Sequence, residues 1–194
     1  MKPEKLTSKD IIGMNGRMLL LACCAPCCVA AVEFLAKNGV DATLFFYNPN
    51  IHPREEYEKR KREAIRVAGR YALPFVEGEY EPAAYDAATA GFEGEPERGA
   101  RCSRCFFLRL SRAAEYAREN GYDGFSSTLG FSRWKNPLQV DEEGKRAEAA
   151  SGTRYLPVDW RREGLQPRAR ELIREQEIYE QKYCGCRWSM NKKR

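Results

Sequence analysis

The eight cysteines of this 194-residue chain fall into three short groups. Four stand in the stretch Cys23-Cys24-Ala25-Pro26-Cys27-Cys28, and the others form the pairs Cys102/Cys105 and Cys184/Cys186. Thiolates grouped in this way are ligands for zinc or for iron–sulfur clusters, each of which commonly takes four. Directly adjacent cysteines are poor disulfide partners, because the bridge strains the peptide between them. The grouping therefore predicts thiolate-bound metal in a reduced compartment, provided that the fold brings the three groups together.

The number of thiols exceeds the need of one metal site. Cys28, which we expect on a first helical turn, is typical of a small buried apolar residue, and setting it aside leaves seven of the eight cysteines. One structural zinc or one four-iron cluster would leave about three thiols over. The surplus favours a second metal or a catalytic thiol pair. A lone structural zinc and a disulfide exchanger built on one C-x-x-C stay open as alternatives.

Several other catalytic motifs do not occur in the sequence. There is no phosphate-binding G-x-x-x-x-G-K-[ST] loop and no G-x-G-x-x-G dinucleotide fingerprint. The C-x-x-x-C-x-x-C pattern of radical S-adenosylmethionine enzymes is missing as well, and so is the ferredoxin spacing. The one histidine, His52, excludes a multi-histidine metal site. Metal chemistry in this chain would therefore depend on sulfur.

The composition predicts a cytoplasmic protein with no membrane partner. Leu20-Leu21-Ala22-Cys23 resembles a lipoprotein cleavage box, but the apolar stretch that contains it is shorter than the roughly 7–15 residues of a signal sequence. No apolar run approaches the roughly 20 residues that cross a membrane. The net charge of +5 permits a polyanionic partner without requiring one. We expect a polar leader over 1–16 and a single α/β catalytic domain over 17–194 that includes the cysteine-bearing tail.

Short apolar runs alternate with helical patterns along the chain. Strands are expected over 17–22, 42–47, 73–76, 124–129 and 155–158. Helices are expected over 29–37, 54–70, 82–90, 102–119, 135–150 and 165–181. This alternation predicts a Rossmann-like (HUP-type) α/β fold, with a mostly parallel sheet of about five strands and helices on both faces.

A parallel sheet would bring the chemically interesting loops together. Right-handed crossovers place every strand-to-helix loop at one edge of the sheet, where ligands bind in such folds. The loops after the first, second, fourth and fifth expected strands contain 23–28, 48–52, 131–136 and 159–162. We therefore expect the first cysteine group to share an edge with these polar loops.

These residues resemble a known family, the cobalamin-independent epoxyqueuosine reductases called QueH. The resemblance covers about residues 18–189, nearly the whole chain. It is carried by Cys23-Cys24-Ala25-Pro26-Cys27, Tyr47-Asn48-Pro49-Asn50-Ile51-His52-Pro53 with Glu56-Tyr57 and Arg60, Cys102-x-x-Cys105 with Arg109-Leu110, Ser127-Thr128-Leu129 with Lys135-Asn136, Asp159-Trp160-Arg161, and Tyr183-Cys184-Gly185-Cys186 with Ser189. The chain departs from the family pattern at Cys28, where a small polar residue is common, and at Leu21, where a histidine is common.

The resemblance implies the last step of queuosine biosynthesis. Epoxyqueuosine at the wobble position 34 of a tRNA with a GUN anticodon would lose its epoxide oxygen in a two-electron reduction. The family is associated with a [4Fe–4S] cluster and a neighbouring mononuclear iron, which agrees with the surplus of thiols. An external electron donor such as ferredoxin or flavodoxin is implied too.

The resemblance also assigns roles to residues. Metal binding is expected of Cys23, Cys24, Cys27, Cys102, Cys105, Cys184 and Cys186. Substrate binding is expected of Asn48, Asn50, His52, Thr128, Lys135, Asn136 and Arg161. Contacts with tRNA are expected of Arg101, Arg104, Arg109 and Arg187, although a solvated helix face is the alternative for such arginines. Asp159 would protonate the leaving oxygen or cap the following segment. Tyr183 and Trp188 would stack on bases or pack beside the metal.

The division of the cysteines between two metals is less constrained. Our working hypothesis gives Cys24, Cys102, Cys105 and one tail cysteine to the cluster, and Cys23, Cys27 and the other tail cysteine to the second metal. Two other functions remain open. An iron–sulfur-dependent tRNA thiolation enzyme that uses ATP would need a phosphate-binding loop after the first strand, where this chain has cysteines. A non-catalytic zinc-binding module would leave the surplus thiols unused.

Overall fold

A fully parallel sheet of five strands forms the centre of the molecule. The computed structural model describes residues 5–190. The strands run in the order β3-β2-β1-β4-β5 and all neighbours are parallel. Their bounds are β1 Met18–Leu21, β2 Ala42–Phe46, β3 Phe75–Glu77, β4 Gly124–Ser127 and β5 Arg154–Tyr155. The expected α/β architecture is thereby confirmed.

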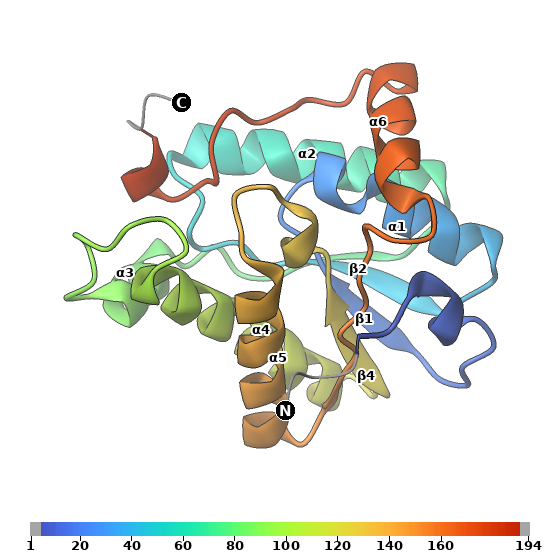
Figure 1. The fold of residues 1–194 in the computed structure, drawn as a ribbon, viewed down its shortest axis with the longest axis horizontal. Coiled ribbons are helices and arrows are strands. Elements are labelled where there is room, and N and C mark those ends of the chain that lie inside the picture. The colour runs from blue at the N-terminus through green and yellow to red at the C-terminus, as the bar shows by residue number, and fades with distance from the viewer. Residues whose placement is uncertain (1–4, 191–194) are drawn as a thin grey trace.

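Helices cover both faces of this sheet (Figure 1). They are α1 Ala25–Lys37, α2 Arg54–Arg70, α3 Pro82–Thr89, α4 Ala100–Glu119, α5 Pro137–Ser151 and α6 Leu165–Glu175. Helices α1, α2 and α6 pack together on one face, and α4 and α5 pack on the other, with α3 beside α4. Three short 3₁₀ turns, Ser8–Ile11, Leu129–Phe131 and Arg187–Ser189, complete the described elements.

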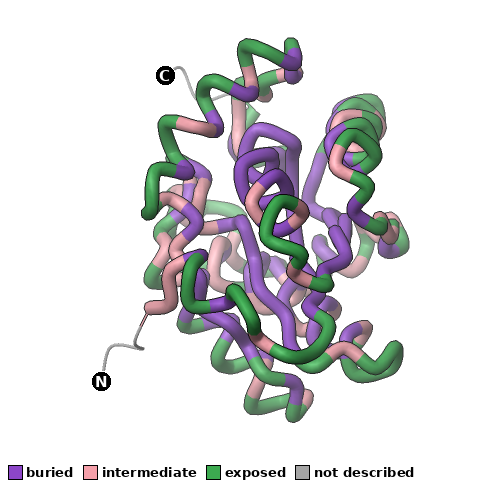
Figure 2. Tube along the Cα trace, turned by 90° about the vertical axis from the view of Figure 1, so that its right-hand side faces the viewer, coloured by how far each residue is buried: buried purple, intermediate pink, exposed green. Residues whose placement is uncertain are grey.

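The central strands are apolar throughout because both of their faces are covered. Alternate residues of β1 enter different cores: Leu20 packs with Leu44 under α1 and α2, while Leu19 packs with Phe45 and Phe125 under α4. Figure 2 shows this buried interior running through the middle of the molecule. Two cores on one sheet hold the carboxyl end of β1 in a defined position.

The point where strand order reverses lies between β1 and β4. The chain first builds outward from β1 to β3 and then returns to add β4 on the other side of β1. Ligands in open α/β sheets bind at such a reversal, beyond the carboxyl ends of the strands. The first cysteine group follows β1 directly and therefore lies at this point, as expected.

Three element boundaries differ from expectation, each for a local reason. Helix α1 begins at Ala25, because Pro26 suits a first helical turn, so Cys27 and Cys28 are helical. Strand β5 is shorter than expected, and Val158 beyond it bridges to Leu6 instead. Helix α6 ends at Glu175 rather than 181, since Glu177 adopts a φ of 49° and turns the chain away.

Part of the expected leader packs on the domain. Leu6 lies beside Val158, and Ile11 is buried in the core under α1. The first four residues of that leader and the last four of the tail are outside the described residues. None of the described helices combines the length and the apolar character that a membrane span requires.

Candidate metal and active site

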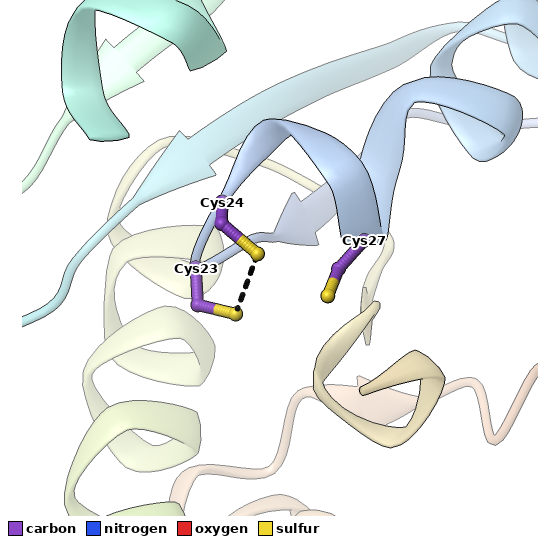
Figure 3. A group of neighbouring side chains, drawn as sticks. All are labelled: Cys23, Cys24 and Cys27. Carbon is purple, nitrogen blue, oxygen red and sulfur yellow. Dashed lines mark hydrogen bonds between the residues drawn. The ribbon is translucent and has the colours of Figure 1, made fainter. Parts of the chain in front are cut away.

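Three thiols meet at the turn between β1 and α1. The sulfur atoms of Cys23, Cys24 and Cys27 lie within 4.8 Å of one another, and the Cys23 and Cys24 sulfurs are 3.6 Å apart (Figure 3). All three residues are buried. The turn brings them together because the strand ends at Leu21 and the helix starts immediately at Ala25. We call Cys23, Cys24 and Cys27 the cysteine trio.

The remaining four metal-ligand candidates form a second neighbourhood. Cys105 of α4 and Cys186 of the tail pack together against Tyr85. Burial raises the pKa of the Cys102 thiol, and the nearby thiols of Cys184 and Cys186 add to this, while the backbone N–H of Arg98 donates to its sulfur at 3.2 Å and opposes it. We call Cys102, Cys105, Cys184 and Cys186 the cysteine quartet. Within residues 5–190, only the trio has three ligand atoms within 4.8 Å of one another.

Lys135 is a buried cation beside both groups. Its side chain is 5% exposed, and its Nζ donates to the Cys23 sulfur at 3.8 Å. Burial lowers the pKa of Lys135, but its interaction with the thiols of Cys184, Cys23 and Cys27 outweighs this, so its pKa is raised. Thiols of the first group and of the tail therefore act on the same ammonium group, and the tail thiols in turn act on Cys102 of the second group.

Cys23 is the thiol that the site stabilises as a thiolate. Hydrogen bonds with Cys24 and Cys27 hold the pKa of Cys23 well below its ordinary value, and the charges of Lys135 and Arg109 contribute. The same hydrogen bonding raises the pKa of its neighbour Cys24 to about 12. Burial raises the pKa of Cys105 to about 12 as well. Most of these thiols therefore need a metal or another strong partner to ionise.

Arg60 of α2 fastens the cysteine-bearing tail. Its guanidinium donates to the backbone carbonyls of Cys184 at 2.9 Å and Tyr183 at 3.1 Å, and pairs with Glu56 at 2.7 Å. The backbone N–H of His52 donates to the carbonyl of Gly185 at 2.8 Å. A Cβ on Gly185, whose φ is 127°, would lie 3.0 Å from Arg60 Nη1. The glycine between the two tail cysteines thus lets the chain lie close against this arginine.

Gln181 is a site residue that sequence reasoning missed. Its Nε2 donates to the Cys24 sulfur at 3.0 Å. The residue was expected inside the last helix, where nothing distinguishes it from other polar positions. Since α6 ends at Glu175, the chain that follows is free to carry Gln181 to the trio. Periodicity contains no signal for such a contact.

Several residues that were expected to bind substrate instead form hydrogen bonds within and between the loops. Asn48 is fully buried; its Nδ2 donates to the carbonyl of Ala22 at 3.0 Å, and its Oδ1 accepts from Arg109. Thr128 is buried, with its hydroxyl 3.5 Å from the carbonyl of Leu21. Asn136 is exposed and caps α5 by accepting from the N–H of Leu138 at 3.0 Å. These side chains position the loops around the thiols.

Asn50 and His52 lie on the loop that holds the tail. Asn50 is buried, and its Oδ1 has no hydrogen-bond partner among the described residues. His52 is exposed, and its backbone carbonyl accepts from the hydroxyl of Tyr183. Trp188, farther along the tail, is 37% exposed. Asn50 is the member of this loop with an open acceptor in the interior.

Asp159 is tied to its own loop. Its Oδ1 accepts from the backbone N–H of Arg161 at 3.2 Å and from Arg161 Nε at 3.1 Å. Burial raises the pKa of Asp159, but these hydrogen bonds from Arg161 outweigh it, and the net pKa is lowered. A carboxylate held ionised is poorly suited to give up a proton near neutral pH. The geometry therefore favours the capping role over the proton-donor role.

Two of the expected tRNA contacts are corrected by burial. Arg101 is 2% exposed and donates to the carbonyls of Glu93 at 2.8 Å and Glu95 at 2.6 Å. Arg109 is fully buried, and its Nε donates to the carbonyl of Tyr47. Neither guanidinium is on the surface, so neither reaches an RNA phosphate. Arg104 and Arg187 are exposed, with Arg187 paired to Asp86 at 2.7 Å.

The donor set fits thiolate-bound iron. All eight cysteines are free thiols. Lys135, Arg109 and Arg60 place three buried cations around them, and of these Arg60 is paired with the carboxylate of Glu56. Buried charge requires a partner of opposite sign, and thiolates that bind iron carry negative charge. The charges around the thiols thus fit an anionic metal–thiolate group.

A family model described as "Epoxyqueuosine reductase QueH" matches residues 18–192. Several curated proteins with that same name are similar to this chain. The Acinetobacter baylyi protein is 45% identical over 175 residues, which cover 90% of this chain and 80% of that protein. The Haemophilus influenzae protein is 43% identical, and the match covers 96% of this chain and 76% of that protein. The Thermotoga maritima protein is 35% identical, and the match covers 92% of this chain and 93% of that protein.

A solved structure shares the fold. The U34-tRNA thiolase NcsA from Methanococcus maripaludis, described with its [4Fe–4S] cluster, superposes with a TM-score of 0.56 over 94% of this chain and 65% of that one, at 13% identity. This likeness establishes the Rossmann-like, HUP-type architecture. The family match and the curated relatives, rather than the fold, exclude the thiolation enzyme and the zinc module. This chain belongs to the QueH family of epoxyqueuosine reductases, which are oxidoreductases.

Proposed function

We propose that this chain reduces epoxyqueuosine at wobble position 34 of a GUN-type tRNA, in the last step of queuosine biosynthesis. Two electrons and two protons enter, both carbon–oxygen bonds of the epoxide break, a carbon–carbon double bond forms, and the oxygen leaves as water. The observation that carries the proposal is the compact cysteine trio, with Lys135 beside it, at the strand-order reversal in a chain of this family. An external low-potential donor such as ferredoxin or flavodoxin would supply the electrons.

We infer that the site holds a [4Fe–4S] cluster and a mononuclear iron. The proximity of Cys102 and Cys105 to both tail cysteines supports the quartet as the cluster ligands. The compactness of the trio supports it as the binding place of the second metal. This division replaces our working hypothesis, which split both groups. NcsA, which has this fold, holds a [4Fe–4S] cluster. When bound, these groups would supply single electrons and a Lewis acid for the epoxide oxygen.

The protein's own residues would bind and orient the substrate. Lys135 offers a buried N–H donor beside Cys23, where a substrate oxygen would approach. Asn50 has an open acceptor in the interior. His52, Asn136 and Arg161 remain candidates for contacts with the nucleoside at the rim. Arg104 and Arg187 are the candidates for phosphate contacts, because they are exposed.

The decisive experiment is conversion of epoxyqueuosine-tRNA by anaerobically reconstituted protein with a low-potential reductant. Active protein should be brown, absorb near ~400 nm and contain more than about four irons per chain. Cys24→Ala and Cys102→Ala should be inactive. Cys28→Ala is the matched control, because Cys28 is buried in the same helical turn but is not in the trio, and it should retain iron and activity. A colourless protein that binds only zinc would contradict the proposal.

A further inference from the structure

The turn that carries Lys135 to the trio also projects a tip, Arg133-Trp134, which the reaction described above does not use. The guanidinium carbon of Arg133 lies 4.2 Å from the centroid of the Trp134 ring. Arg133 is exposed, and Trp134 is half-buried. Flat guanidinium and indole groups are surfaces on which unpaired bases stack. We call Arg133 and Trp134 the tip.

The tip lines two pockets at the surface. The first, of 350 Å³, reaches Cys27 of the trio and is bounded by the tip, Gln181 and Arg170 of α6. The second, of 430 Å³, is bounded by the tip, Arg98 and Glu97. Small-molecule sites are typically about 300–1,000 Å³, so each cavity has room for one nucleobase. Arg133 and Trp134 are the residues that line both.

The tip is held in place rather than hanging free. Arg98 Nη2 donates to the carbonyl of Arg133 at 2.7 Å, and the N–H of Trp134 donates to Ser132 Oγ at 3.3 Å. Gln139 of α5 in turn fastens the Arg98 segment, donating to the carbonyl of Arg98 at 3.2 Å and to Ser103 Oγ at 2.7 Å. A tip tied to the Arg98 segment in this way can keep two neighbouring bases apart.

Charge around the two cavities suits a single-stranded RNA. Arg98, Arg133 and Arg170 line them, together with the carboxylates of Glu97 and Glu180. The guanidinium groups would face backbone phosphates. The carboxylates and the amide of Gln181 would accept hydrogen bonds from base N–H groups or sugar hydroxyls. One base would then lie against the trio, and its neighbour would lie on the far side of the tip.

We propose that the Arg133-Trp134 tip is a wedge between two nucleotides of the anticodon loop. It would hold the modified nucleotide in the cavity beside Cys27 and the adjacent nucleotide in the cavity beside Arg98. This inference rests on the proposed function and adds to it the residues that unstack the substrate.

The test measures binding of an anticodon stem-loop RNA to the iron-loaded protein by fluorescence anisotropy. Parallel stem-loops carry 2-aminopurine at position 34 or at a neighbouring position, whose fluorescence reports unstacking. Trp134→Ala should weaken binding about tenfold and abolish the 2-aminopurine response, while Trp134→Phe restores most of both. Arg133→Ala should weaken binding more than Arg118→Ala, which removes one exposed charge from the last turn of α4. Iron content and the visible spectrum should be unchanged in all four variants.

Failure of the wedge and failure of the function give different results. If Trp134→Ala binds and unstacks the RNA like the unaltered protein, the wedge is overturned while the reductase activity stands. If Arg118→Ala weakens binding as much as Arg133→Ala, the contribution is general charge and the wedge is overturned as well. If the unaltered iron-loaded protein neither binds the stem-loop nor converts epoxyqueuosine, both the wedge and the proposed function fall.

Discussion

The guanidinium of Arg60 donates a hydrogen bond to the backbone carbonyl of Cys184 at 2.9 Å. One buried side chain on α2 therefore holds the backbone of a cysteine that lies 124 residues farther along the chain. Burial lowers the pKa of Arg60, but the nearby thiol of Cys24 and the hydrogen-bonded carboxylate of Glu56 outweigh this effect and raise it. It thus links the tail to the trio, both mechanically and electrostatically.

Replacing Arg60 should release the tail and leave a buried carboxylate unpaired. Arg60→Met leaves Glu56 without its ion-pair partner, and breaking a buried pair in this way costs about 3–5 kcal/mol of unfolding free energy. Iron content should fall and the tail should become sensitive to protease. The measurements are urea unfolding, iron analysis and limited proteolysis.

Arg66→Met is the matched control for Arg60. Arg66 lies on the same helix and also donates to a backbone carbonyl, that of Gln176 at 2.8 Å, but its side chain is 42% exposed. The Arg66→Met protein should lose less than about 1 kcal/mol of unfolding free energy and should keep its iron. If the two substitutions change stability and iron content equally, Arg60 does not fix the tail more than Arg66 does.

Serine substitutions should separate the two cysteine groups. Cys105→Ser, in the quartet, should remove about four irons per chain and the absorbance near ~400 nm. Cys27→Ser, in the trio, should remove about one iron and leave most of that absorbance. Iron analysis beside Mössbauer spectroscopy measures both. Loss of the whole cluster in Cys27→Ser would instead favour a mixed set of ligands.

Gln181 should influence the metal without binding it. Gln181→Leu removes the donor 3.0 Å from the Cys24 sulfur, and loss of such an outer hydrogen bond typically costs about 10–100-fold in metal affinity or activity. A competition titration with a chelator measures the change in affinity. Gln166→Leu, in the same cavity but exposed on α6, is the control that should be unaffected.

Acid should weaken the contact between α1 and α6. Arg168 donates to both oxygens of Glu33 at 2.8 and 2.9 Å, and this pairing, assisted by Lys37, lowers the pKa of Glu33 to about 2 despite burial. A lowered folded-state pKa means that this stability is present above the unfolded value near ~4.3 and is lost as the pH falls toward 2.

Urea unfolding of the metal-free protein between pH 5 and pH 3 measures this contribution. Because Arg168 is partly solvated, the unfolding free energy lost between these pH values should be about 1–2 kcal/mol. This loss should be absent in Glu33→Gln. Glu171→Gln removes an exposed partner of the same arginine and should keep the pH dependence. A pH profile of Glu33→Gln parallel to that of the unaltered protein would contradict the assignment.

The sequence by itself was sufficient for the class of fold and for the family. Apolar runs such as 18–21 and 42–46 become buried strands because their pattern is local and both faces of the sheet are covered. Pro26 and the spacing of the first cysteines are equally local, so the place of this cysteine group directly after the first strand could be predicted. The motifs also identified the family.

Only the tertiary structure decided which groups meet. Arg101 and Arg109 look like surface arginines of a charged helix, yet both are buried. Arg101 donates to carbonyls of the loop just before α4, and Arg109 donates to Tyr47 and Asn48, about 60 residues away in the sequence. The division of the cysteines into trio and quartet depends on where the tail crosses α2, and thus on Arg60. Contacts between segments more than a hundred residues apart leave no periodic trace in a single sequence, because they arise from packing rather than from local backbone preference.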